Sequence, residues 1–267
     1  MGNITNSCKN CNQTLQGKYC HSCGEKIVEN QDFSIKTIFR EAVDGFTNVD
    51  SKFLKSFKYL LFKPGKLTKT YVEGIRKPFM KPIQIFLIAN LLFFFFLPKS
   101  DILRIPSAYY FTVEFRVDSL KEKSTESGLS QQELMKLYDS KSATYSKAFV
   151  FIIIPFFAML LALVNFLKKY QFGKHVIFAI HYFSFFLLFC VLLLLIPYVE
   201  GNSMVIQISI VAVNFLYLLF AIKTFYRDRW IISGVKALVG MTGFIFIALQ
   251  YRSLISDVSL LLLNRNL

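Results

Sequence analysis

Five long apolar segments constrain this chain more than any other feature, because a helix needs about 20 apolar residues to cross a bilayer. Of the 267 residues, 54% are hydrophobic, which is more than a soluble core of this size requires. The segments lie at 82–97, 148–167, 176–197, 204–222 and 231–250. The sequence therefore predicts an all-α integral membrane protein whose transmembrane domain, 82–250, contains about five helices.

The first and last of these segments are the weakest. Segment 82–97 is the shortest and is bracketed by Pro82 and Pro98. Segment 231–250 is interrupted by Lys236, whose long side chain is expected to extend back to the lipid headgroups.

The formal net charge of +14 is distributed unevenly along the chain. Basic residues gather before the first segment and in the connections 168–174 and 223–230, whereas the turn at 198–203 has none. By the positive-inside rule, this alternation predicts a cytoplasmic N-terminus and, with five spans, a C-terminus outside. The basic residues are expected to contact anionic membrane lipid rather than nucleic acid. The predicted lipid and phosphate contacts are Arg76, Lys77, Lys81, Lys168, Lys169, Lys174, Arg227 and Arg229.

Four cysteines near the N-terminus, Cys8, Cys11, Cys20 and Cys23, have the spacing C-x2-C-x8-C-x2-C. Two such pairs are typical of a Zn²⁺ site with four thiolate ligands. A disulfide framework is disfavoured because thiols on the cytoplasmic side stay reduced. A redox-active thiol pair is disfavoured because it needs only one C-x-x-C motif. We predict a zinc-ribbon head at residues 1–30, held together by a structural Zn²⁺. A closed site of this kind supports folding or docking rather than catalysis.

Residues 31–81 are predicted to form amphipathic helices at the membrane interface, because apolar residues recur there at three- and four-residue steps. A break is expected between Gly45 and Asp50, and further breaks at Pro64–Gly65 and at Gly74. Such helices can lie in the headgroup plane or pack against the cytoplasmic ends of the spans, and the sequence does not decide between the two.

Residues 98–147 are predicted to form a small extracytoplasmic insert. Apolar and polar residues alternate over 111–118, which predicts a half-buried strand. Ser130 and Glu133 have the spacing of a capping box, which predicts a helix from that point. Residues 251–267 are expected to form a C-terminal tail.

Ionisable residues are rare in the apolar segments. His181 lies within the third, with His175 at its edge, and Ser184 is one helical turn from His181 as a possible hydrogen-bond partner. The two histidines are about 240° apart around a helix, so they do not share a metal-binding face. Together these three residues form a candidate polar site, which either joins helices or handles a ligand or proton.

Several motifs resemble those of an uncharacterised bacterial family, catalogued as domain-of-unknown-function family 3667. They are the four cysteines, "FKYLLFKPGKLTKTYVEGIRKPFMKPIQIFL", "GKHVIFAIHYFSF" and "FYRDRWIISGVKAL". The resemblance implies a zinc-ribbon head on several spans and an address in the bacterial inner membrane. It implies no established activity.

The sequence contains no G-x-S-x-G, H-E-x-x-H or dinucleotide-binding motif, so we predict that the protein is not an enzyme. The favoured hypothesis is a non-enzymatic inner-membrane scaffold or regulator whose head recruits a cytoplasmic protein partner. The alternatives are a transporter or lipid-handling protein that uses the region around His181, and a membrane enzyme with His181 as its base.

Overall fold

The computed structural model describes residues 7–15, 17–27, 50–96, 103–112, 114–195 and 203–264. Within these ranges the regular structure is helical, apart from isolated β-bridges between Ser7 and Thr14 and between Tyr19 and Lys26. The predicted all-helical class is confirmed for this part of the chain.

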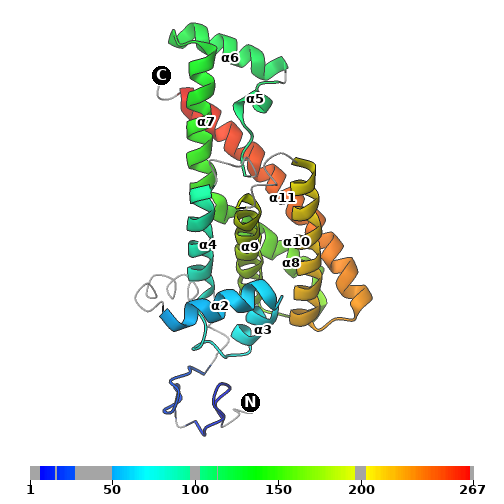
Figure 1. The fold of residues 1–267 in the computed structure, drawn as a ribbon. Coiled ribbons are helices and arrows are strands. Elements are labelled where there is room, and N and C mark those ends of the chain that lie inside the picture. The colour runs from blue at the N-terminus through cyan, green and yellow to red at the C-terminus, as the bar shows by residue number, and fades with distance from the viewer. Residues whose placement is uncertain are drawn as a thin grey trace.

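Five apolar helices form the central bundle, with α9 (Phe172–Leu194) in the middle of it (Figure 1). The others are α4 (Pro82–Phe96), α8 (Ile153–Val164), α10 (Ser203–Tyr226) and α11 (Trp230–Asn264). Helix α9 packs against α4 and α8, and α10 packs against α11. Phe157 and Tyr182 place their rings against Phe244, with centroids 5.2 Å away in each case. Aromatic packing of this kind joins α8, α9 and α11 into one core.

Within the described ranges, three helices, α9, α10 and α11, are long and apolar enough to cross a membrane. A fourth span results if α7 (Gln131–Ala148) and the segment Val150–Val164 are taken together across a bend of 46°. Helix α4 has 15 residues and is about 22 Å long, shorter than a hydrocarbon core of about 30 Å. The structure thus supports a membrane protein, and five spans remain a prediction.

Helices α2 (Asp50–Phe62) and α3 (Lys66–Val72) lie across one end of the bundle (Figure 1). The hydroxyl of Ser56 accepts the backbone N–H of Met80 at 2.8 Å, and the carbonyl of Leu60 accepts the Tyr217 hydroxyl at 2.8 Å. Leu54 and Phe62, in contrast, are about three-quarters exposed. Helix α2 therefore packs on the bundle with one face and leaves apolar side chains exposed on another. Residues 31–49 of the predicted amphipathic segment, with the break expected there, lie outside the described ranges.

The predicted breaks at Pro64–Gly65 and Gly74 are confirmed. Gly65 has a φ of 71°, and a Cβ at this position would collide with the backbone of Ala221 on α10. Only glycine combines this left-handed conformation with such a close approach. Gly65 thus lets α3 start directly against α10.

The predicted strand at 111–118 is wrong. After α5 (Ser107–Tyr110) the chain turns at 111–112, and from Glu114 it forms α6 (Glu114–Ser127). An isolated strand needs a neighbour to satisfy its backbone groups, and the described ranges supply none, whereas a helix satisfies them internally. The capping box at Ser130 and Glu133 is confirmed at the start of α7.

The predicted tail at 251–267 is also corrected, because α11 continues to Asn264. Its 35 residues extend about 52 Å, far beyond a bilayer core of about 30 Å. The far end of α11 packs along α7. We call this region, residues 103–112, 114–148 and 251–264, the distal module.

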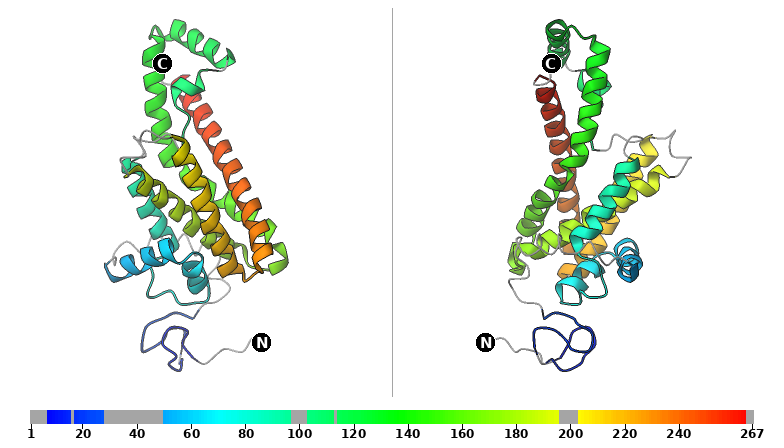
Figure 2. Two further views of the ribbon diagram at one scale, coloured as in Figure 1. Left: turned by 45° about the vertical axis from the view of Figure 1, so that its right-hand side comes forward. Right: turned by 90° about the vertical axis from the view of Figure 1, so that its left-hand side faces the viewer.

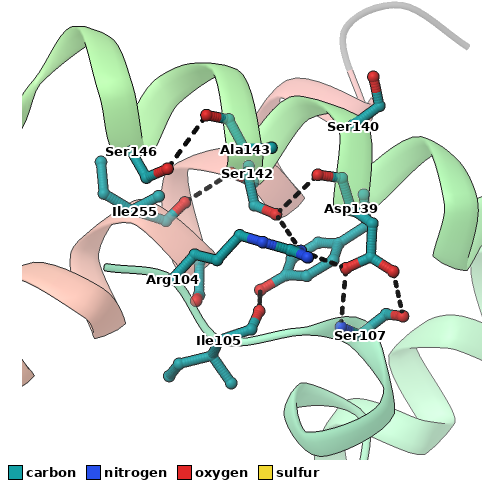
Figure 3. A network of polar contacts seen from close by, with 12 residues as sticks. Arg104, Ile105, Ser107, Asp139, Ser140, Ser142, Ala143, Ser146 and Ile255 are labelled. Carbon is teal, nitrogen blue, oxygen red and sulfur yellow. Dashed lines mark hydrogen bonds and ion pairs between the residues drawn. The ribbon is translucent and has the colours of Figure 1, made fainter. Parts of the chain in front are cut away.

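A network of polar contacts (Figure 3) and an aromatic cluster hold the distal module together. The Asp139 carboxylate accepts hydrogen bonds from Arg104 Nη1 at 2.7 Å and from the Ser107 backbone and hydroxyl at 3.0 and 2.7 Å. The rings of Tyr110 and Tyr138 stack with centroids 4.9 Å apart. These contacts attach the segment before α6 to the side of α7.

The two ends of the molecule differ in character. The four-cysteine head, α2, α3 and the connections at 165–171 and 227–229 lie at one end, and the distal module lies at the other (Figure 2). This arrangement agrees with the alternation of basic connections along the sequence.

Candidate metal centre and buried polar contacts

The structure brings the sulfurs of Cys8, Cys11, Cys20 and Cys23 within 4.8 Å of one another. The Sγ atoms of Cys8 and Cys23 are 3.5 Å apart, as are those of Cys11 and Cys20, and all four thiols are free. Sulfurs bound to one tetrahedral ion at about 2.3 Å would be about 3.8 Å apart. The cluster is therefore compatible with a metal site of four thiolate ligands.

Two similar turns shape this cluster. In the first turn, the Cys8 N–H donates to the Gln13 carbonyl and the Asn12 N–H to the Cys8 carbonyl. In the second turn, the Cys20 N–H donates to the Glu25 carbonyl and the Gly24 N–H to the Cys20 carbonyl. The fourth residue after each leading cysteine is left-handed, Asn12 with φ 59° and Gly24 with φ 69°. Asparagine and glycine are the residues that tolerate this conformation best. Each turn therefore directs its two sulfurs to one point.

The backbone also prepares one thiol for ionisation. The backbone N–H groups of Cys23 and Ser22 lower the pKa of Cys20 to about 6, against the opposing effect of burial. A backbone hydrogen bond from Gln13 lowers the pKa of Cys11, but burial and the neighbouring thiols outweigh it and raise this pKa to about 12. An ion binding here would need thiolates from all four residues, and it would displace the remaining protons.

The head contacts the segment 73–81, between α3 and α4, which we call the juxtamembrane segment. The buried Glu25 carboxylate accepts the backbone N–H of Arg76 at 3.1 Å and that of Lys77 at 3.0 and 3.2 Å. Lys77 Nζ donates in return to the carbonyl of Cys23. No sequence pattern indicates this role for Glu25, because its partners are about fifty residues away.

The predicted lipid-contacting residues divide into two groups. Some of these side chains contact the protein itself. Arg76 lies over the Tyr71 ring and Lys174 over that of Tyr170, Lys77 donates to the Cys23 carbonyl, Lys168 pairs with Asp228, and Arg227 pairs with Glu73. Lys169 and Arg229 are exposed, and Lys81 is half-buried. These residues lie at the same end of the bundle, but only part of the set is directed outward.

A buried charge cluster at this end was not predicted. Asp228 lies in the turn between α10 and α11, its side chain only 6% exposed, with Lys168 Nζ at 2.8 Å and Lys236 Nζ at 2.7 Å. Lys236 Nζ also donates to Asn165 Oδ1 at 2.8 Å. The side chain of Lys236 thus ends on protein groups rather than on lipid headgroups. Two sequence features could have indicated the pair of Asp228 and Lys236. The connection 223–230 has a single acid among its basic residues, and the following apolar segment contains one lysine.

His181 joins α9 to α3. Its Nδ1 lies 2.9 Å from the hydroxyl of Thr68, and its ring meets Tyr71 edge-on at 6.4 Å. The predicted partner Ser184 donates to the carbonyl of Ile180 on its own helix instead. All of these groups are buried. The surroundings of His181 are therefore those of a contact between helices.

His175 forms a separate contact, between α9 and α10. Its Nδ1 lies 2.7 Å from the Tyr226 hydroxyl, and the two rings stack with centroids 5.7 Å apart. The two histidines thus have different partners on different helices, in agreement with their expected separation around α9. The candidate polar site of three residues is not assembled as one site.

We expect His181→Leu to lower the free energy of unfolding in mixed micelles by about 0.6–2 kcal/mol, because a polar contact between membrane helices contributes about that much. Thr68→Val should cost a similar amount, and the double variant should lose less than the sum. Ser184→Ala is the control and should show no coupling to His181. Additive losses for Thr68 and His181 would contradict the assignment.

The model of the family described as "Protein of unknown function (DUF3667)" matches residues 50–94. This range covers α2, α3, the juxtamembrane segment and most of α4, and so contains the contacts with Glu25, His181 and Ala221. No curated protein and no solved structure matches the chain. The family match supports membership of the chain in this uncharacterised family.

Proposed function

We propose that the protein is a non-enzymatic membrane adaptor whose zinc-bound cytoplasmic head recruits a protein partner. The observation that carries this proposal is the closed cluster of four thiols, held against the juxtamembrane segment through Glu25. Zinc is the metal we assign, because four thiolates in a closed tetrahedral set are its usual structural ligands in a reducing compartment. A site without an open coordination position has no place for a substrate.

The head has one face on the juxtamembrane segment and another exposed. The Glu25 carboxylate is turned toward the juxtamembrane segment, whereas Tyr19 is 62% exposed. Tyrosine is enriched among the residues that contribute most to protein interfaces, since it combines a large apolar ring with a hydrogen-bonding hydroxyl. We therefore assign the partner to the face that carries Tyr19.

We also propose that the end with the head faces the cytoplasm of a bacterial cell, with the protein in the inner membrane and the end of α11 outside. The basic connections at this end support the orientation. Leu54 and Phe62, exposed on α2 beside Lys55, Lys58 and Lys63, support contact with an anionic lipid surface. Each such lysine is expected to add about 1 kcal/mol of attraction.

The transporter hypothesis receives less support. His181 Nδ1 contacts Thr68 and its ring meets Tyr71, and His175 Nδ1 contacts Tyr226, in buried contacts between helices. The buried Nε2 of His181 has no hydrogen-bond partner in the described part of the chain. The adaptor proposal uses neither histidine.

Site-specific photo-crosslinking in intact cells tests the adaptor. With the photoreactive residue p-benzoylphenylalanine at position 19, we expect a crosslink to one protein partner. The same residue at position 109 is the matched control, because Tyr109 is 73% exposed in α5, at the other end of the molecule.

The crosslink at position 19 should disappear when Cys20→Ser is introduced into the same chain, because this change removes one ligand of the metal site. A crosslink that survives Cys20→Ser, or that forms equally at position 109, would contradict the proposal.

A further inference from the structure

A groove of about 450 Å³ lies between the start of α8 and the middle of α11, beside the bend between α7 and α8. This volume is within the range of sites that bind small molecules, about 300–1,000 Å³. Both helices contribute apolar walls, but its polar residues come from α11 alone. The residues that matter here are Ile153, Phe156, Phe246, Gln250, Ser253 and Asp257.

The position of the groove along α11 places it at the boundary of the membrane core. Trp230, an aromatic residue suited to the interface, starts the helix, and Gln250 lies 20 residues further on, a rise of about 30 Å. That distance equals the thickness of the hydrocarbon core. Phe246 then lies at the level of the acyl chains, and Asp257 lies about 10 Å beyond Gln250, among the headgroups.

The groove changes from apolar to polar in the same direction. Phe156 and Phe246 line its apolar end and are more than half exposed, and contact of these rings with water would be unfavourable. Gln250, Ser253 and Asp257 follow at steps of three and four residues, so they share one face of α11. A ligand that matches this order has an apolar chain and a polar headgroup.

The charge at the polar end of the groove restricts the chemistry of the ligand headgroup further. Asp257 is the charged residue in the lining, and its side chain is 55% exposed. Its Oδ1 accepts the Tyr110 hydroxyl at 2.9 Å, and Arg116 Nη2 is 4.0 Å away. A carboxylate held in this way can still accept hydrogen bonds from a cation in the groove.

We propose that this groove binds a membrane phospholipid whose headgroup ends in a primary ammonium, with one acyl chain along Phe156 and Phe246 and the ammonium at Asp257. A quaternary ammonium lacks the N–H donors, and a headgroup that is only anionic has no cation to pair with the carboxylate. This proposal is independent of the adaptor function, because it concerns the opposite end of the molecule.

Native mass spectrometry of the full chain, released from an equimolar mixture of phosphatidylethanolamine, phosphatidylcholine and phosphatidylglycerol, tests the proposal. We expect wild type to retain the ethanolamine lipid about two- to fivefold over the others, the size expected for one partly exposed ion pair. Asp257→Asn keeps an acceptor for Tyr110 and should keep bound lipid while losing this preference. Ser253→Phe fills the groove and should reduce total retained lipid.

Asp118→Asn, an exposed acid on α6, is the matched control and should behave like wild type. Equal retention of the three lipids by wild type, or an unchanged preference in Asp257→Asn, would overturn the proposal. A dimer that carries no lipid would also overturn it, since a second copy of the chain would then cover the groove.

Discussion

Chelation of the zinc that we propose for the four-cysteine site is expected to unfold the head and to release it from the juxtamembrane segment. Within the described part of the head, the buried residues are Cys8, Cys20 and Glu25, which is too little apolar surface to stabilise a fold. A structural Zn²⁺ contributes about 10–16 kcal/mol in zinc-finger peptides of this size. The metal therefore outweighs every other interaction in the head.

Alkylation followed by intact-mass measurement checks this expectation. Before chelation, Cys8, Cys11, Cys20 and Cys23 should be protected and one zinc should be present per chain; after chelation all four should react. Cys190, fully buried in α9, is an internal control that should stay unmodified under both conditions.

Hydrogen exchange gives a second measurement of the same event. The amides of Arg76 and Lys77 donate to Glu25, so they should lose protection when the metal is removed. The amide of Met80 donates to Ser56 and should remain protected. Thiols that react equally before chelation, or protection at Arg76 and Lys77 that does not depend on metal, would contradict the prediction.

The second large effect is expected for Asp228→Asn, which should lower the free energy of unfolding by about 3–5 kcal/mol. The substitution leaves Lys168 and Lys236 without the carboxylate that contacts both of them, and the Lys236 side chain is only 15% exposed. An uncompensated buried charge costs more than the ion pair contributed. Denaturant titration in mixed micelles measures the loss.

Two further variants make this test specific. Lys236→Met in the Asp228→Asn background removes the stranded charge and should recover part of the stability. Asp118→Asn, whose partner Lys121 is exposed, should cost less than about 1 kcal/mol. An Asp228→Asn variant as stable as wild type would show that the pair contributes nothing.

The pH dependence of this cluster has a definite sign. Burial raises the pKa of Asp228, but hydrogen bonds from Lys168 and Lys236 outweigh it and hold the pKa below its ordinary value of 3.8. A carboxyl whose folded pKa is lowered stabilises the protein above the unfolded value, and the contribution is lost as pH falls through the folded value. The cluster should therefore stabilise the protein at neutral pH and lose this effect only below about pH 4.

Local features of this protein were predictable because they depend on neighbours in the chain. The four-cysteine spacing brought the thiols together, the capping box at Ser130 formed, and Gly65 and Gly74 separated helices as expected. The apolar segments correspond to helices of the bundle. The alternation of apolar and polar residues over 111–118 led to a wrong prediction. Such alternation predicts a strand only where a second strand is available to pair with it.

Contacts between distant parts of the chain were not predictable in this way. Glu25 bonds to Arg76 and Lys77, Thr68 to His181, and Asp228 to Lys168 and Lys236, and in each case the partner is chosen by how the helices pack. The length of α11 likewise depends on α7, which covers its far end. Composition and spacing by themselves determined the apolar helices, their basic end and the thiol cluster, since each of these follows from a local pattern. Only the tertiary structure decided which buried polar group meets which, because a polar group in a bundle is satisfied by whatever donor or acceptor the packing places beside it.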